Sequence, residues 1–164
     1  MKHANKHLTR KETGFTLLEV LIALLVLSIG LLGLAALQTT GLRSNQMASM
    51  RTQATQVAYD ITDRMRANPA GVTAGEYVIA LGTTPSGTSR AETDLIEWRD
   101  VVEDLPGGQS DIVFCDSADV PPCDPDAHII TVYWNETRDP AASVGTCPPT
   151  SNADFRCYRL VFSE

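Results

Sequence analysis

The first long pattern in the chain is an apolar run over residues 15–37, in which Glu19 is the single charged residue. A helix of this length reaches about 34 Å, enough to cross a hydrocarbon core of about 30 Å. No proline interrupts the run, so Gly30 and Gly33 are its weakest helical positions, because glycine costs about 1 kcal/mol relative to alanine. The pattern predicts a helix that can hold the chain in a bilayer.

Beyond residue 37 the pattern becomes amphipathic, and one helix is expected to continue through residues 38–68. Apolar residues recur there at three- and four-residue spacing, which is typical of a helix with one buried face. We expect the helix to end at Asn68-Pro69-Ala70-Gly71, since proline disfavours helical geometry in the preceding residue and glycine favours a turn. The apolar positions are Met50, Ala54, Val57, Ala58, Ile61 and Met65.

Residues 69–164 are expected to form one globular head that opens with a connector. Residues 72–90 are rich in Gly, Thr and Ser and predict a mobile segment, with a short strand candidate at residues 77–81. A capping box over residues 89–92 then predicts a second, short helix at about residues 91–105.

The rest of the head has β character in three runs, at residues 111–115, 128–135 and 155–162. In the second run Ile130, Val132 and Trp134 share one face, which suits packing against a helix. We therefore expect a small antiparallel sheet wrapped on the amphipathic half of the long helix, an α+β fold.

The segment before the apolar run is basic, with Lys2, Lys6, Arg10 and Lys11 against Glu12. Positive charge ahead of a span keeps the N-terminus in the cytoplasm and sends the rest of the chain out. The apolar run is longer than the core of an ordinary secretory signal, and the small residue lies before it rather than after it. Cleavage at that residue would therefore leave the helix on the mature protein.

The junction reads Gly14-Phe15-Thr16-Leu17-Leu18-Glu19, which resembles the cleavage site of type IV prepilins. The resemblance implies that a prepilin peptidase cuts after Gly14 and methylates the new N-terminal residue, Phe15. It also matches Glu19 to the acidic residue on the first helical turn of these proteins. Residues 1–14 would then be a cleaved leader and residues 15–37 the transmembrane and filament-core half of the long helix.

A longer stretch, over residues 10–70, is similar in particular to PilV-type minor pilins. The similarity implies an assembly subunit that primes the pilus, possesses neither enzymatic activity nor a cofactor, and can lie at the pilus tip. Its partners would be other minor pilins, the major pilin, the prepilin peptidase and the inner-membrane assembly machinery. The head would be periplasmic before assembly and on the cell surface afterwards. Two alternatives stay open, a type II secretion pseudopilin and a single-pass membrane-anchored enzyme or sensor.

Glu19 has two interpretations. A carboxylate four residues from the new terminus can reach the membrane interface and simply be tolerated there. Alternatively, its charge at membrane depth, which costs about 2.5 to 3.5 kcal/mol, is paired with the cationic amine of Phe15. That amine could belong to the same chain or to a neighbouring subunit, and only the second pairing would set an assembly register.

The whole chain carries a net charge of −7, and its acidic residues are concentrated in the head. No basic stripe is present, so nucleic acid is not an expected partner. All four cysteines lie in the predicted extracytoplasmic head, which predicts two disulfides. Of three connectivities we favour Cys115–Cys123 and Cys147–Cys157, because each would close a loop beside a strand.

Metal binding and catalysis have little support in the sequence. The cysteine spacings are long for a zinc site, and the acidic residues between Cys115 and Cys123 and just beyond lack an EF-hand pattern for calcium. His128 would be the single histidine left after leader removal, at the start of a predicted strand, where a structural role is expected. No nucleophile elbow or metal-ligand motif is recognisable.

Overall fold

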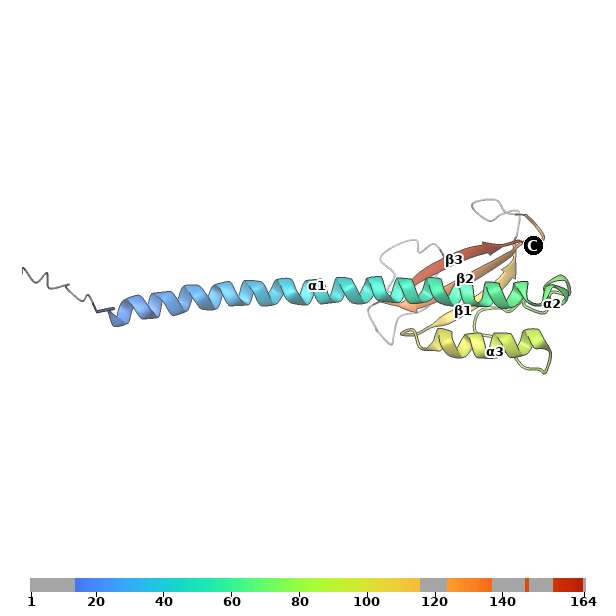
Figure 1. The fold of residues 1–164 in the computed structure, drawn as a ribbon, viewed down its shortest axis with the longest axis horizontal. Coiled ribbons are helices and arrows are strands. Elements are labelled where there is room, and N and C mark those ends of the chain that lie inside the picture. The colour runs from blue at the N-terminus through green and yellow to red at the C-terminus, as the bar shows by residue number, and fades with distance from the viewer. Residues whose placement is uncertain (1–13, 116–123, 137–146, 148–154, 164) are drawn as a thin grey trace, which may run out of the picture. The chain divides into compact units, whose positions relative to one another are not determined.

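The computed structural model of the chain describes residues 14–115, 124–136, 147 and 155–163. The chain divides into two compact units, Met1–Ser44 and Asn45–Glu164. We call the first the stem, and from here on the head is the second unit, which includes the second half of α1 as well as the residues 69–164 expected from the sequence. The helices and a three-stranded antiparallel sheet together make an α+β fold, as the sequence predicts (Figure 1). The elements are α1 (Leu17–Arg66), α2 (Pro69–Thr73), α3 (Arg90–Glu103), β1 (Gln109–Phe114), β2 (His128–Asn135) and β3 (Phe155–Phe162).

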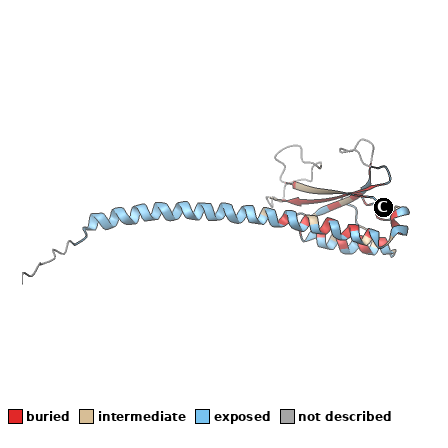
Figure 2. Cartoon of the chain, turned by 45° about the horizontal axis from the view of Figure 1, so that its top comes forward, coloured by how far each residue is buried: buried red, intermediate tan, exposed pale blue. Residues whose placement is uncertain are grey.

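Helix α1 changes its environment along its length. Every described stem residue is exposed, and Met50 is the first buried residue of the helix (Figure 2). From there to Met65 the apolar face predicted from the sequence enters the head core, which confirms that interpretation. Thr62 joins this face, where its hydroxyl donates to the carbonyl of Ala58 at 2.8 Å. The helix runs unbroken through Gly30 and Gly33.

The end of α1 differs from the expectation. The helix ends at Arg66, and Pro69 begins the short helix α2 instead of a simple turn. Asn68 caps α2, since its side chain accepts a hydrogen bond from the Gly71 amide at 3.3 Å. Proline is well suited to the first helical position because it has no amide hydrogen to leave unpaired. A Cβ on Gly71 would lie 2.5 Å from Asn68 Nδ2, so the close approach explains this glycine.

The expectation of a mobile connector over residues 72–90 is wrong for two of its residues, Tyr77 and Ile79, which are held in place by contacts with the rest of the head. The Tyr77 side chain is fully buried, donating to Asp94 Oδ2 at 2.7 Å and accepting from Asn68 Nδ2 at 3.2 Å. Ile79 forms an isolated antiparallel bridge to Ile112 of β1. The segment is therefore attached to both α3 and the sheet.

Helix α3 begins at the predicted capping box. Ser89 accepts from the Glu92 amide at 3.2 Å, and the Glu92 side chain accepts from the Ser89 amide at 3.1 Å. Trp98 fixes the helix to α1, because its fully buried indole donates to the carbonyl of Val57 at 2.8 Å. Arg64 adds an ion pair to Glu97 at 2.6 Å. These contacts hold α3 alongside α1 in the head.

The sheet has the order β1-β2-β3, and both pairs of strands are antiparallel. Strands β2 and β3 coincide with the predicted ranges, and β1 begins two residues earlier than expected. One face packs on the helices through Ile112 of β1 and through Ile130, Val132 and Trp134 of β2, with Tyr158 and Leu160 of β3 against them. The central strand β2 is buried along its whole length.

A disulfide joins Cys147 to Cys157 of β3, with their Cα atoms 5.9 Å apart. This is the pairing that the sequence favours for these two residues. Cys115, directly after β1, is also disulfide-bonded, and its predicted partner Cys123 lies outside the described residues. Disulfides persist in oxidising compartments, so the head is suited to a location outside the cytoplasm.

Replacing Tyr77 by phenylalanine tests the attachment of the connector. We expect Tyr77→Phe to lower the free energy of unfolding by about 1 to 3 kcal/mol, because it removes a buried hydrogen bond to a charged group. Burial, and then the bond to Asp94, raises the pKa of Tyr77 to about 12. The folded protein therefore holds this proton more tightly, and the stabilisation present below pH 10 is lost as the pH rises through 12.

The measurement is the thermal unfolding of the detergent-solubilised protein and its variant between pH 7 and pH 12. The stability difference between the two proteins should shrink above pH 10. A difference that stays constant would show that the phenol does not carry the effect.

Removing the Cys147–Cys157 disulfide should destabilise the protein. Its sequence separation is 10 residues, for which loop-closure entropy gives about 3 kcal/mol of stabilisation. The Cys147→Ser/Cys157→Ser double variant should therefore unfold at a lower temperature than the wild type under non-reducing conditions. Reductant should destabilise this variant further, since Cys115 remains in a disulfide. A variant with wild-type unfolding temperature would contradict the prediction.

Candidate processing and assembly site

The start of α1 is defined by Thr16. Its carbonyl oxygen accepts hydrogen bonds from the amides of Glu19 and Val20 at 3.1 and 3.3 Å, and its hydroxyl accepts from Glu19 at 3.2 Å. A threonine at this position satisfies amides that a helix leaves unpaired in its first turn. The helix therefore begins directly after the junction, and Gly14 and Phe15 lie outside it.

Gly14 and Phe15 are accessible. The Phe15 side chain is 83 % exposed, and a Cβ added to Gly14 would meet no atom within 4 Å. Neither packing nor a positive φ therefore requires glycine at this position. This separates Gly14 from Gly71, whose Cβ would clash within the fold. A requirement for glycine at position 14 therefore has to come from a molecule that binds the chain at this junction.

Glu19 lies on the first turn of α1 and is exposed. An acidic residue there interacts favourably with the helix dipole. The ion pairs among the described residues are all made by head residues. The carboxylate is therefore open to a partner that the described chain does not itself supply.

The surface that follows Glu19 on α1 is apolar on all sides. Its large side chains are between 47 % and 71 % exposed from Val20 to Leu37. By length and composition, α1 is the one described helix able to cross a membrane, and a signal sequence near an N-terminus would pass the same test. Such an all-round apolar helix needs a lipid or protein environment. The stem fits membrane anchoring.

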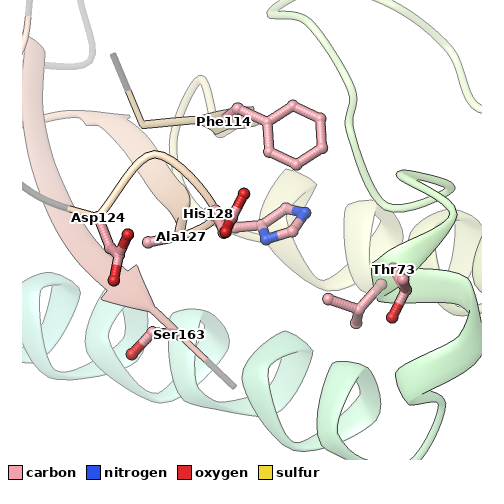
Figure 3. Close-up of a pocket in the computed structure, with 8 residues that line it drawn as sticks. Thr73, Phe114, Asp124, Ala127, His128 and Ser163 are labelled. Atoms are coloured by element: carbon pink, nitrogen blue, oxygen red, sulfur yellow. The ribbon is translucent and has the colours of Figure 1, made fainter. Parts of the chain in front are cut away.

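A second feature is a pocket of about 500 Å³ in the head, between α2 and the ends of the sheet strands (Figure 3). Phe114 and the buried His128 form part of its wall, with their ring centroids 4.7 Å apart. Asp124 and Asp126 also line it. Within the described ranges, however, no three acidic, histidine or cysteine side chains are gathered as a metal site would require.

Sequence reasoning missed one polar cluster, centred on Glu136. Its side chain is only 8 % exposed and pairs with Arg51 of α1 at 3.2 Å and Arg156 of β3 at 3.0 Å. Arg51 and Arg156 are separated from Glu136 by 85 and 20 positions in the chain, so no local sequence pattern identifies the cluster. It joins the first buried turns of α1 to the sheet.

Comparison with known proteins supports the interpretation of the junction. A family model described as the prokaryotic N-terminal methylation motif matches residues 9–35, which include Gly14, Phe15 and Glu19. No curated protein and no solved structure matches the chain. The match covers the junction at Gly14 and Phe15 and most of the apolar half of α1, and it supports a type IV pilin-like protein.

Proposed function

We propose that the protein is a minor pilin of the PilV type, a structural subunit of a type IV pilus. The observation that carries the proposal is the methylation motif at residues 9–35, placed directly before an exposed apolar helix that continues into a folded head. The similarity of residues 10–70 to PilV-type sequences supports the finer assignment. A pilin-type motif also points to a structural protein rather than an enzyme.

In this proposal a prepilin peptidase cuts the bond between Gly14 and Phe15. The geometry supports it, since both residues precede the helix and are exposed. Glycine at position 14 is then required by a narrow substrate-binding site in the peptidase, because the fold of this chain does not require it. Methylation of Phe15 leaves its amine basic, so the mature chain starts with a positive charge close to Glu19.

Glu19 then recruits the amine of a neighbouring subunit. Its charge is costly in the bilayer and has no ion-pair partner among the described residues. Pairing with another subunit offsets that cost and places the two stems in a defined axial register. Packing between apolar stems replaces their lipid contacts at the same time.

The proposed route starts in the bacterial inner membrane, with the N-terminus cytoplasmic and the head periplasmic. The basic leader supports this orientation, and the disulfide in the head supports export. The partners are the prepilin peptidase, the assembly machinery, the major pilin and other minor pilins, with which this subunit primes the filament. After assembly the head is displayed on the pilus, including its tip.

Deleting the gene from its host tests this assignment. Loss of surface pili, with restoration by the wild-type gene and normal type II secretion, is the expected result. A secretion defect with normal piliation would instead assign the chain to the pseudopilins. Unchanged pili and secretion, with the leader uncut, would favour a membrane-anchored enzyme or sensor.

Two substitutions at Gly14 test processing. Gly14→Val should leave full-length precursor in the membrane, because a branched side chain does not fit a peptidase site that accepts glycine. Gly14→Ala is the matched control and should be cut to a much larger extent. The measurement is intact-mass analysis of the membrane fraction from cells with active peptidase. Efficient cleavage of Gly14→Val, or a mature chain that starts elsewhere than Phe15, would refute the assigned site.

Variants of Glu19 test the register. Glu19→Ala should be cut and inserted normally but reach sheared filaments about tenfold less, as expected for the loss of about 1.4 kcal/mol of pairing energy. Glu19→Asp should be intermediate, because it keeps the charge and shortens the reach. Glu76→Gln, which removes a charge from the head, is the control. Normal incorporation of fully processed Glu19→Ala would leave Glu19 as a merely tolerated interface residue.

A further inference from the structure

The head has a groove of about 440 Å³ between α1 and the C-terminal end of α3. Its floor is apolar, because Val57 and Leu105 are buried, and Val101 stands at its rim with 44 % of its surface exposed. The remaining lining residues are polar or acidic: Gln53, Gln56, Asp60 and Asp104.

The two helices that form the groove are held in place by other contacts. Trp98 bonds to the carbonyl of Val57 at 2.8 Å, and Arg64 pairs with Glu97 at 2.6 Å, further along the same pair of helices. The hydrogen bond that Arg64 donates to Glu97 raises the pKa of the guanidinium. The groove is therefore a feature of a fixed helix pair.

The charge at the groove is negative. Asp60 is already paired, with its carboxylate 3.0 Å from Arg64. Asp104 lines the groove, and Asp100 lies one helical turn before it, next to Val101. Both aspartates are exposed, and neither forms an ion pair within the described part of the chain.

The acidic residues at the C-terminal end of α3 destabilise this helix. The last turn of the helix contains no basic residue, although Glu103, Asp100 and the C-cap Asp104 are all acidic. Negative charge at a helix C-terminus interacts unfavourably with the helix dipole, and like charges four residues apart repel each other. The fold of the head alone thus disfavours these aspartates, whereas a cation bound beside them would relieve the conflict.

We propose that this groove docks the stem helix of a neighbouring pilin subunit, at a point where that helix presents an aliphatic residue next to a lysine or arginine. The aliphatic side chain would pack on Val57 and Leu105, and the basic group would face Asp100 and Asp104. The stem of this chain displays that chemistry itself, since Leu42 is 62 % exposed and is followed by Arg43. The inference rests on the proposed pilus function and assigns a docking surface to it.

The first test separates folding from assembly. In the Asp100→Asn/Asp104→Asn variant the detergent-solubilised protein should unfold at the wild-type temperature or higher, because an unfavourable charge pair is removed. Its amount in sheared filaments should fall about fivefold, which corresponds to about 1 kcal/mol. The matched control is Asp124→Asn/Asp126→Asn, which removes two exposed aspartates elsewhere on the head and should assemble normally.

The second test identifies the occupant. Val101 and Val161 are 44 % and 45 % exposed, and each is replaced in the full chain by the photoreactive residue p-benzoyl-phenylalanine. After irradiation of piliated cells, position 101 should crosslink to the stem helix of another pilin, close to a lysine or arginine. Position 161 on β3 should give little of this crosslinked product. Crosslinking from position 101 should decrease when the Asp100→Asn/Asp104→Asn substitutions are present in the same chain.

Three results would overturn the inference. They are equal crosslinking from positions 101 and 161, crosslinks from position 101 to proteins other than pilins, and normal incorporation of the double aspartate variant. A double variant less stable than the wild type would contradict the charge argument itself. Absence of the wild-type protein from filaments would instead reject the proposed function, so the two failures are distinguishable.

Discussion

The structure depends on one constraint, which is that a single helix has to satisfy two different surroundings. From Met50 to Met65 the apolar face of α1 is covered by α3 and the sheet. From Leu17 to Leu42 its large apolar side chains are uncovered. Burying a leucine-sized side chain is worth about 1.5 to 3 kcal/mol, so the uncovered surface requires a cover from outside the chain. Lipid and the stems of other subunits can each provide one.

The covered half of α1 also organises the head. Ala54 and Ala58 are fully buried small residues on this face, where α3 attaches through the indole of Trp98 and the carbonyl of Val57. Glu136 joins the same helix to β3 through Arg51 and Arg156. The head is therefore built around the second half of α1.

Periodicity and capping patterns predicted the parts of this fold that depend on local chemistry. The buried face of α1, the Ser89 capping box and strands β2 and β3 are of this kind. Contacts between distant residues were not predictable in this way. Tyr77 lies in a segment rich in glycine, serine and threonine, and its burial depends on Asp94 and Asn68. Pro69 is compatible with both a helix end and a helix start, and the cap by Asn68 decided between them.

The residues of the processing and assembly site could be predicted from the sequence, whereas the groove in the head could not. The order of residues around Gly14, Phe15 and Glu19 is a local signal, and the matched methylation motif covers it. The structure adds that Gly14 is free of any packing requirement and that Thr16 begins the helix. The groove between α1 and the end of α3 could not be inferred from the sequence, because its floor joins Val57 of α1 to Leu105, which follows α3.

The most direct measurement compares the wild-type protein in two fractions of its host, the inner membrane and the sheared surface filaments. Intact-mass and peptide analysis should find the same mature chain in both, beginning with N-methylated Phe15. This result would show one processed stem covered first by lipid and then by other subunits. A chain that begins at Met1, or a processed chain confined to the membrane, would contradict the account.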